Sequence, residues 1–284
     1  MVLGRGTRLR LLAAFMTAAC IVLIGPSAPS GAPSAVALPS YAAKKVVANR
    51  VLTWNICNPC GRSGHNVGRA AEIATYAPQV FGLQEACVRD VEKIRDYLEN
   101  FYGLVYHVEY GTVLRNWSRC GGLPWRPGAF GQALLSAAPM TDRVQTEYPD
   151  GGSEDRGYLA VTTEVGGRPV RVFNTHLAER RQPEVRARQV RVLAAEVARH
   201  DRTIVLGDFN AVPDAPELGG MWALARDTDP ECRPSPAGGA CETTTDWQSK
   251  FDYVFLRGIT PLAHRVRPSL YSDHHLLYSD LGPV

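Results

Sequence analysis

Polar side chains stand at the ends of several apolar, strand-like segments of this 284-residue chain. The positions are Thr53-Trp54-Asn55, Gln84-Glu85, Asn174-Thr175-His176, Gly207-Asp208-Phe209-Asn210, Asp252-Tyr253 and Ser272-Asp273-His274. In each case a carboxylate, amide or imidazole closes, follows or opens an apolar run. Because active-site residues are often carried by loops on a rigid scaffold, we expect these groups to form one site.

This set of groups suits the hydrolysis of a phosphate ester. Carboxylate and amide oxygens make a hard, oxygen-rich site of the kind that Mg²⁺ or Mn²⁺ prefers. The histidines at 176 and 274 would donate to a phosphate or move protons. The sequence has no Gly-x-Ser-x-Gly elbow, no His-Glu-x-x-His motif and no Gly-x-x-x-x-Gly-Lys loop. These absences argue against acyl-transfer, zinc-protease and nucleotide-loop chemistry.

In this order, the motifs resemble the endonuclease/exonuclease/phosphatase superfamily. Pancreatic-type deoxyribonuclease, abasic-site endonuclease, neutral sphingomyelinase and inositol polyphosphate phosphatase belong to it. Gly-Asp-Phe-Asn alone is a moderate signal, but it is strong together with the earlier Asn-Thr-His and the later Asp-Tyr and Ser-Asp-His. The resemblance runs from about residue 46 to the C-terminus. It implies a four-layer α/β sandwich, in which two packed mixed sheets are flanked by helices.

The resemblance also implies a metal site. Glu85 matches the metal-binding Glu of the family, Asn55 the Asn that supports it, and Asp273 an Asp near the metal. The cofactor would be Mg²⁺ or Mn²⁺, and a structural Ca²⁺ is a further candidate. One position departs from the pattern, because Gln132 stands where the family usually has Asn after Gly.

The catalytic roles follow in the same way. Asp208 and Asn210 match the pair that orients or activates the attacking water, and His176 matches the His that hydrogen-bonds the phosphoryl oxygens. His274 matches the catalytic His, with Asp252 fixing its tautomer. The resemblance leaves open whether Asp208 or His274 deprotonates the water. The neighbouring His275 is the alternative to His274, although alternation of side chains would point it to the other face.

Two residues are candidates for substrate contact. Arg188 belongs to a group of arginines at 180, 181, 186, 188 and 191, which would either contact phosphates or form a solvated helix face paired with glutamates. Trp125 lies with Trp117 in a loop rich in Gly and Arg.

The elements that must position these groups alternate along the chain. Apolar and β-branched runs predict strands at 46–56, 80–83, 102–110, 130–136, 158–165, 170–176, 203–206, 251–256, 265–268 and 276–279. Helical periodicity predicts helices at 67–77, with Asn66 as N-cap, and at 88–99 and 183–200. Gly166-Gly167 predicts a hairpin turn. Strands with helices between them suggest two sheets covered by helices.

The N-terminus reads as a secretory signal peptide at 1–37. Three arginines precede an apolar run at 11–25, and Ala35-Val36-Ala37 forms a cleavage pattern. An uncleaved anchor and lipidation at Cys20 are the alternatives. A flexible segment at 38–45 and a catalytic domain at 46–284 would follow. The chain has 31 Lys and Arg against 28 Asp and Glu, and the three leader arginines account for the excess. A globally basic, polyanion-coating protein is therefore not indicated.

Six cysteines remain beyond the leader, and an even number in an exported chain indicates disulfides. Cys232 and Cys241 close a loop rich in Pro and Gly and are the favoured pair. The other four would pair as Cys57–Cys60 with Cys87–Cys120, or crosswise. A second Cys-x-x-Cys is absent, so a zinc or redox role for 57–60 is disfavoured.

We therefore predict a secreted phosphodiester hydrolase that acts on nucleic acid, with DNA as the first choice of substrate. A phospholipid head group is the second choice, but no run of consecutive aromatics that would insert in a membrane is visible. Sugar or inositol phosphate comes third. A non-catalytic binding module is disfavoured because every motif keeps its key group. We expect a monomer with no obligate protein partner.

Overall fold

Two six-stranded mixed sheets form the body of the protein in the computed structural model, which describes residues 43–58, 65–234 and 240–283. The predicted signal peptide, Cys60 and most of the segment 38–45 lie outside these residues. The first sheet has the order β13 (Pro261–Arg267), β14 (Leu276–Leu281), β1 (Val47–Asn55), β2 (Pro78–Cys87), β6 (Ala129–Ser136), β3 (His107–Arg115). The second has the order β11 (Arg226–Asp227), β12 (Asp252–Arg257), β10 (Thr203–Asp208), β9 (Arg168–His176), β8 (Gly157–Val165), β7 (Met140–Glu147).

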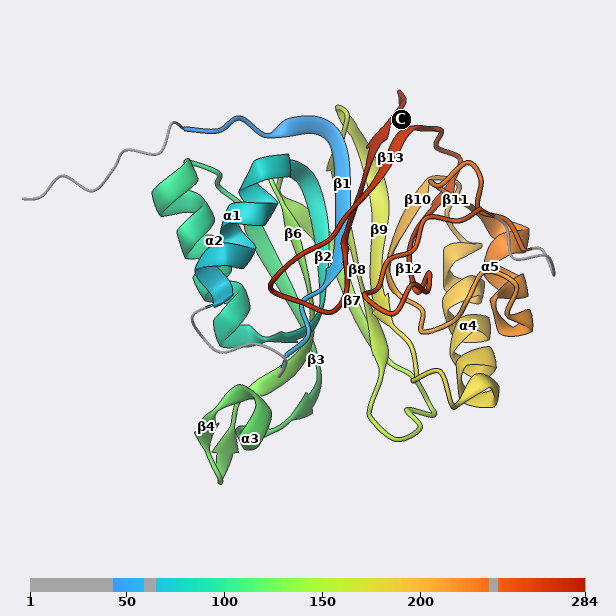
Figure 1. Ribbon diagram of the computed structural model, residues 1–284, viewed down its shortest axis with the longest axis horizontal. Coiled ribbons are helices and arrows are strands. Elements are labelled where there is room, and N and C mark those ends of the chain that lie inside the picture. The colour runs from blue at the N-terminus through green and yellow to red at the C-terminus, as the bar shows by residue number, and fades with distance from the viewer. Residues whose placement is uncertain (1–42, 59–64, 235–239, 284) are drawn as a thin grey trace, which may run out of the picture. The chain divides into compact units, whose positions relative to one another are not determined.

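Helices cover the outer face of each sheet, as Figure 1 shows. The helices are α1 (His65–Tyr76), α2 (Val88–Tyr102), α3 (Trp117–Cys120), α4 (Pro183–Val197) and α5 (Gly219–Leu224), and the 3₁₀ helix η1 spans Pro216–Leu218. Ile73 of α1 and Ile94 of α2 belong to the core on the first sheet. Leu193 of α4 and Met221 of α5 belong to the core on the second. A third core, which includes Val51 and Leu206, fills the space between the sheets. These layers confirm the predicted four-layer sandwich.

Each sheet contains one parallel pair of strands joined through a helix. In the first sheet β1 runs parallel to β2, with α1 between them along the chain, and Asn55 pairs with Gln84 at the end of the register. In the second sheet β9 runs parallel to β10, with α4 between them, and His176 pairs with Asp208. The carboxyl ends of both parallel pairs therefore carry the predicted site residues, which is where α/β sheets place their ligands.

A buried polar cluster joins the two sheets next to these strand ends. The amide nitrogen of Asn174 on β9 donates to the carbonyl oxygens of Leu83 on β2, at 3.0 Å, and Ala133 on β6, at 2.8 Å. Its oxygen accepts from Nε2 of Gln84 at 2.6 Å. A Cβ atom at Gly82 would lie 2.8 Å from this amide, so glycine is required for the close approach. These three bonds pair both the nitrogen and the oxygen of the Asn174 amide, as is usual for a buried polar group.

Several predicted elements differ from the observed ones. The strand expected at 102–110 is displaced to β3, because α2 continues to Tyr102 and ends at Gly103, which has the left-handed conformation (φ 67°). Helix α1 begins at His65, so Asn66 is inside it and donates to Asp90 instead of capping it. Strand β7 was not predicted, because its residues are mostly exposed and polar and show no alternation.

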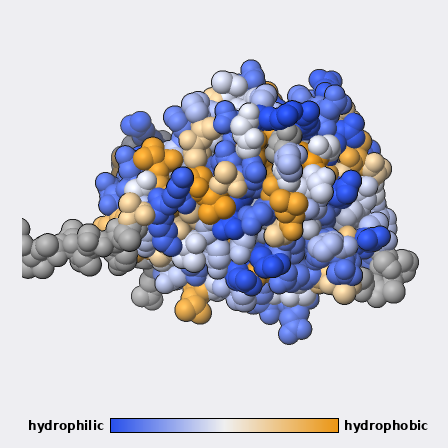
Figure 2. Space-filling view, turned by 90° about the horizontal axis from the view of Figure 1, so that it is seen from above, coloured by the Kyte–Doolittle hydropathy of each residue, from blue (hydrophilic) through white to orange (hydrophobic). Residues whose placement is uncertain are grey.

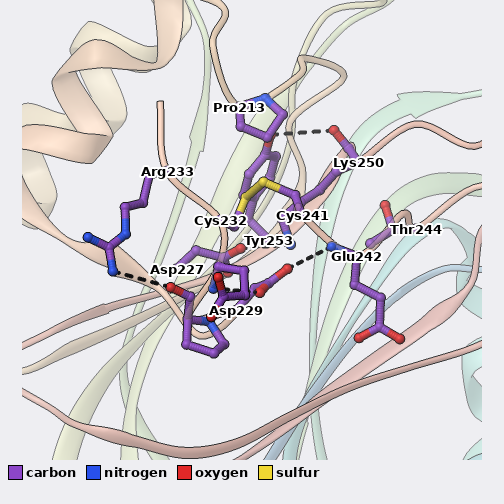
Figure 3. The surroundings of a disulfide bond; sticks show 12 residues. Pro213, Asp227, Asp229, Cys232, Arg233, Cys241, Glu242, Thr244, Lys250 and Tyr253 are labelled. Atoms are coloured by element: carbon purple, nitrogen blue, oxygen red, sulfur yellow. Dashed lines mark hydrogen bonds and ion pairs between the residues drawn. A yellow bond between two sulfur atoms is a disulfide. The ribbon is translucent and has the colours of Figure 1, made fainter. Parts of the chain in front are cut away.

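Two disulfides join cysteines that both lie in the described part of the chain. Cys232 and Cys241 are bonded as predicted, and Figure 3 shows their surroundings. Cys87 and Cys120 are also bonded to each other, so neither of them pairs with Cys57 or Cys60. Cys57 is disulfide-bonded as well. None of the described helices is long and apolar enough to cross a membrane.

Candidate active site

The predicted metal-side residues meet at the end of β1. The side-chain nitrogen of Asn55 donates to Oε1 of Glu85 at 3.2 Å and to Oδ2 of Asp208 at 2.9 Å. Its oxygen accepts from the backbone N–H of Cys57 at 2.9 Å. Asn55, which the resemblance implies to be the Asn that supports the metal-binding Glu, thus contacts both the Glu85 and the Asp208 carboxylates through its amide nitrogen.

Glu85 lies on a distorted stretch of β2. Its backbone has φ 50°, in the left-handed region that a non-glycine residue with a long side chain seldom adopts. The pairing of β2 with β6 shifts register between Leu83 and Ala86, which marks a bulge that turns the carboxylate toward Asn55. Burial raises the pKa of Glu85, against the lowering effect of the Asn55 hydrogen bond. A carboxylate on strained backbone is typical of a functional position.

A buried acid–imidazole pair lies beside this cluster. Nδ1 of His274 is 2.8 Å from Oδ2 of Asp252, and Nε2 of His274 is 3.7 Å from Oδ2 of Asp208. Burial lowers the pKa of His274, but the charges of Asp252 and Asp208 outweigh it and raise the pKa to about 10. Burial raises the pKa of Asp208 to about 7. At neutral pH the imidazole therefore holds its proton more firmly than the carboxylate does.

The Ser-Asp-His segment is fastened to the end of β1. Oγ of Ser272 donates to the carbonyl oxygen of Asn55 at 2.6 Å and accepts from the N–H of His274 at 3.1 Å. The indole N–H of Trp54 donates to the carbonyl oxygen of His274 at 3.0 Å. These three bonds fix the backbone of His274 relative to the end of β1.

The Gly-Asp-Phe-Asn motif turns sharply where β10 ends. Gly207 has φ +156°, and a Cβ atom there would lie 2.2 Å from the carbonyl oxygen of Thr175. Asn210 has φ 51°, and its N–H donates to Oδ1 of Asp208 at 2.8 Å. The Asn210 amide nitrogen lies 3.0 Å from Nε2 of His176. The turn thus places an amide between the buried carboxylate and the second imidazole.

His176 is kept neutral by its surroundings. Burial, together with the nearby Arg156 guanidinium, lowers its pKa well below the usual value. Nη1 of Arg156 lies 3.0 Å from Nδ1 of His176. A guanidinium can only donate, so Nδ1 accepts from Arg156. The Asn210 amide nitrogen at Nε2 is a donor as well, so these two contacts do not fix which ring nitrogen carries the hydrogen. Nε2 is 3.4 Å from Oδ2 of Asp208, so this nitrogen faces the site.

Arg156 is a site residue that the sequence did not reveal. It is buried and forms an ion pair with Oε1 of Glu154 at 2.7 Å. Glu154 in turn binds Nη1 of Arg119 at 2.5 Å. No motif marks this loop, but Gly157 pairs with His176 in the sheet, so the residue before it must lie next to that histidine.

A match to a family model decides the classification. The model of the endonuclease/exonuclease/phosphatase family matches residues 52–274, most of the chain. The chain belongs to this family. A search of the curated proteins gives no match.

Solved structures share the family fold at low sequence identity. An endonuclease/exonuclease/phosphatase family protein from Leptotrichia buccalis is 13% identical with a TM-score of 0.67, covering 83% of this chain and all of that one. TDP2 of D. rerio, complexed with single strand DNA product, is 18% identical with a TM-score of 0.66, covering 82% and 98%. An endonuclease/exonuclease/phosphatase from Beutenbergia cavernae is 24% identical with a TM-score of 0.61, covering 82% and 70%.

The donor set fits the divalent cation that family members generally use. Among the described residues, Asp208, Asp252 and His274 bring three donor atoms within 4.8 Å of one another. Asp252 and His274 already bind each other, however, so we assign this group to the acid–imidazole pair. Glu85 is the better ligand, because its carboxylate is one-quarter exposed and only Oε1 is held. Oδ1 of Asp273 is buried without a hydrogen-bond partner, which suits a position near a cation.

The remaining predicted residues lie apart from this cluster. Arg188 forms an exposed ion pair with Asp150. Trp125 is 80% exposed between the short strands β4 (Gly122–Leu123) and β5 (Arg126–Pro127). His275 lies 3.2 Å from Asp246, so His274 is the histidine that the site contains. Gln132 is buried on β6, and its Nε2 has no hydrogen-bond partner.

An open cavity of about 650 Å³ adjoins the catalytic residues. Arg180, Arg181, Asn210 and Trp247 line it, together with Glu179, Ser249 and Phe251. The indole of Trp247 meets the His274 ring edge-on at 5.4 Å and is 44% exposed. Sequence reasoning did not single out Trp247, because no motif surrounds it.

Proposed function

We propose that the protein is a secreted, metal-dependent phosphodiesterase that cleaves DNA. The observation that carries this proposal is the cavity beside His274, where two exposed arginines face an exposed indole. Guanidinium groups neutralise the phosphates of a polynucleotide. An indole offers a stacking surface for an unpaired base. A substrate that carries only a phosphate group would interact with the arginines, but it has no base to stack on the indole.

The described residues divide the chemistry between them. A divalent cation on Glu85 would polarise a phosphoryl oxygen and neutralise charge that develops on it. Asp208, with its pKa of about 7, is poised to take a proton from water. Nε2 of His176 faces the site and would donate to a phosphoryl oxygen, while Arg156 occupies Nδ1. His274, held protonated by Asp252, supplies positive charge and a proton to the leaving oxygen.

Two further observations support the proposal. TDP2 of D. rerio, whose fold is similar, has been solved with single strand DNA product. The leader-like N-terminus and the disulfides Cys87–Cys120 and Cys232–Cys241 are typical of an exported chain.

A second candidate function rests on a projecting arm. The arm consists of residues 117–127, with α3, β4 and β5, and Figure 1 shows it extending beyond β3. Trp117, Leu123 and Trp125 are 56%, 49% and 80% exposed on it. Exposed indoles beside arginines are typical of a membrane interface, which favours cleavage of a phospholipid head group. On the face that Figure 2 shows, apolar side chains form only small separate groups among hydrophilic ones.

Parallel assays on plasmid DNA and sphingomyelin liposomes, each with Mg²⁺ or EDTA, test the proposal. We expect metal-dependent nicking of the plasmid. The double variant Arg180→Ala/Arg181→Ala should lose most of this activity and its steep salt dependence, whereas the exposed pair Arg199→Ala/Arg202→Ala should retain both. Head-group release with intact plasmid would overturn the proposal in favour of a phospholipase. Equal nicking by both double variants would remove the cavity as its basis.

A further inference from the structure

An unpaired imidazole lies between two carboxylates near the Cys232–Cys241 disulfide, outside the candidate active site. Nε2 of His264, on β13, is 3.8 Å from Oδ2 of Asp229 and 3.7 Å from Oε2 of Glu242. The His264 side chain is only 4% exposed, and Nε2 has no hydrogen-bond partner. Figure 3 shows Asp229 and Glu242 beside the disulfide. Both separations are too long for a hydrogen bond.

Nδ1 of His264 has a hydrogen-bond partner, but this partner leaves Nε2 unpaired in either tautomer of the ring. Nδ1 of His264 lies 2.9 Å from Oγ1 of Thr228, which can donate or accept. If Nδ1 carries the hydrogen, the lone pair of Nε2 faces two negative groups. If Nε2 carries it, the hydrogen reaches no acceptor. Burial and the Lys250 ammonium hold the pKa of His264 at about 4, so the ring does not solve the problem by becoming charged at neutral pH. A buried polar atom without a partner is costly.

We propose that Asp229, Glu242 and His264 bind a divalent transition-metal ion of the Zn²⁺ class. One imidazole nitrogen with carboxylate oxygens is a ligand set that zinc takes, with bonds of about 2.0–2.2 Å. Two ligands of one ion cannot be farther apart than about twice that length, and both separations from Nε2 meet this limit. Thr228 would accept from Nδ1 and so fix the metal-binding tautomer.

The carboxylates differ in how far they are already in place. Asp229 is buried, and its two oxygens accept from the N–H groups of Glu231 at 3.0 Å and Glu242 at 2.8 Å. The Glu242 side chain is half exposed and must move toward Asp229, since these three donors do not all lie within 4.8 Å of one another. A cavity of about 300 Å³, lined by Thr228 and all three proposed ligands, leaves room for this movement and for water as a further ligand.

An ion at this position would fasten the segment that supports the catalytic pair. Glu242 is two residues before Thr244, whose Oγ1 accepts from the N–H groups of Phe251 and Asp252 at 3.0 Å each. Thr245 forms a bridge with His274. The ion would thus join β13 to the segment that holds Asp252 and His274, without itself touching substrate.

Zinc titration of the metal-stripped protein tests the proposal, read by isothermal calorimetry and by the visible absorption of Co²⁺ in place of Zn²⁺. Against the parent, His264→Gln should bind one equivalent fewer, and Glu242→Gln should bind that equivalent at least ~10-fold more weakly. His107→Gln, at an exposed histidine on β3, is the matched control and should bind like the parent. Zinc bound at other sites contributes equally to the parent and to each variant, so it cancels when their stoichiometries are compared.

Thermal unfolding separates loss of the site from loss of the fold. Zn²⁺ should raise the Tm of the parent and of His107→Gln but not that of His264→Gln. Equal stoichiometry and equal Tm shifts in the parent and His264→Gln would overturn the proposal, whichever substrate the enzyme proves to cleave. Misfolding of His264→Gln would transfer the test to Glu242→Gln, whose half-exposed side chain is not needed for packing. Parent-like zinc affinity in that variant would also overturn it.

Discussion

Asp252 and His274 are joined by a 2.8 Å contact between Oδ2 and Nδ1, and both side chains are almost completely buried. A carboxylate at this distance stabilises the charged imidazolium and raises the pKa of His274 to about 10, against the effect of burial. The contact therefore supports the imidazole as the acid of the proposed mechanism, and Asp208 as the group that we propose takes the proton of water.

Replacing Asp252 by Asn should lower kcat on the order of 10³–10⁴-fold. If protonated His274 is required, activity falls as pH rises through its pKa. Loss of the carboxylate lowers that pKa, so the alkaline limb of the pH–rate profile should move to lower pH in the variant. Asp246→Asn, at an exposed aspartate beside His275, is the control. An alkaline limb that does not move would contradict the assignment.

Replacing Arg156 by Met should lower kcat on the order of 10²-fold, because His176 loses the guanidinium partner of its Nδ1, which orients the ring. The pKa of His176 should rise, since the nearby guanidinium is one cause of its low value. Nitrogen NMR of the imidazole measures both the tautomer and the pKa. Arg156→Lys should restore part of the activity. Arg143→Met removes another ion-paired arginine, bound to Glu109, and should leave the tautomer unchanged.

Replacing Asn55 by Ala should weaken Mg²⁺ or Mn²⁺ binding by roughly 10–100-fold, the usual effect of losing a group that orients ligands. The reason is that the amide holds Glu85 and Asp208 close together although their charges repel. Calorimetric titration measures the affinity. Asn100→Ala, at the exposed end of α2, is the control. An unchanged Kd would show that the carboxylates keep their places without the amide.

Removing the two disulfides separately should lower stability by different amounts. They close segments of 33 and 9 residues. Loop-closure entropy then predicts losses of about 3.7 kcal/mol for Cys87→Ser/Cys120→Ser and about 2.6 kcal/mol for Cys232→Ser/Cys241→Ser. Urea unfolding measures both, and each variant serves as the control for the other. A larger loss of stability in Cys232→Ser/Cys241→Ser than in Cys87→Ser/Cys120→Ser would mean that residual structure or local packing outweighs the effect of loop length.

The sequence predicted the fold and most of the site because the motifs end strands. Once Asn55 and Glu85 close one parallel pair and His176 and Asp208 close another, the sheet topology brings them together. The sequence could not show which end of the Asn55 amide faces the carboxylates, because both ends can hydrogen-bond.

Arg156 and Trp247 escaped detection for another reason. They lie on loops without motifs. The pairing of Gly157 with His176 places Arg156 beside that histidine, and the bridge between Thr245 and His274 brings Trp247 to the other. Arg188 illustrates the converse case. Its place in a group of helix arginines left open both phosphate contact and a solvated helix face paired with glutamates, and a neighbouring loop supplies Asp150 as its partner.

The Asn174 amide determines how the two halves of the reaction centre are aligned. Its three hydrogen bonds reach strands of the opposite sheet, and they can all form at only one stagger of the sheets. Glu85 belongs to one sheet and His176 to the other, so the same amide sets the span between the proposed ligand of the cation and the proposed donor to the phosphate. Aliphatic packing alone tolerates small sliding, whereas this amide does not. The alignment of the two groups is thus set by a side chain that is fully buried between the sheets.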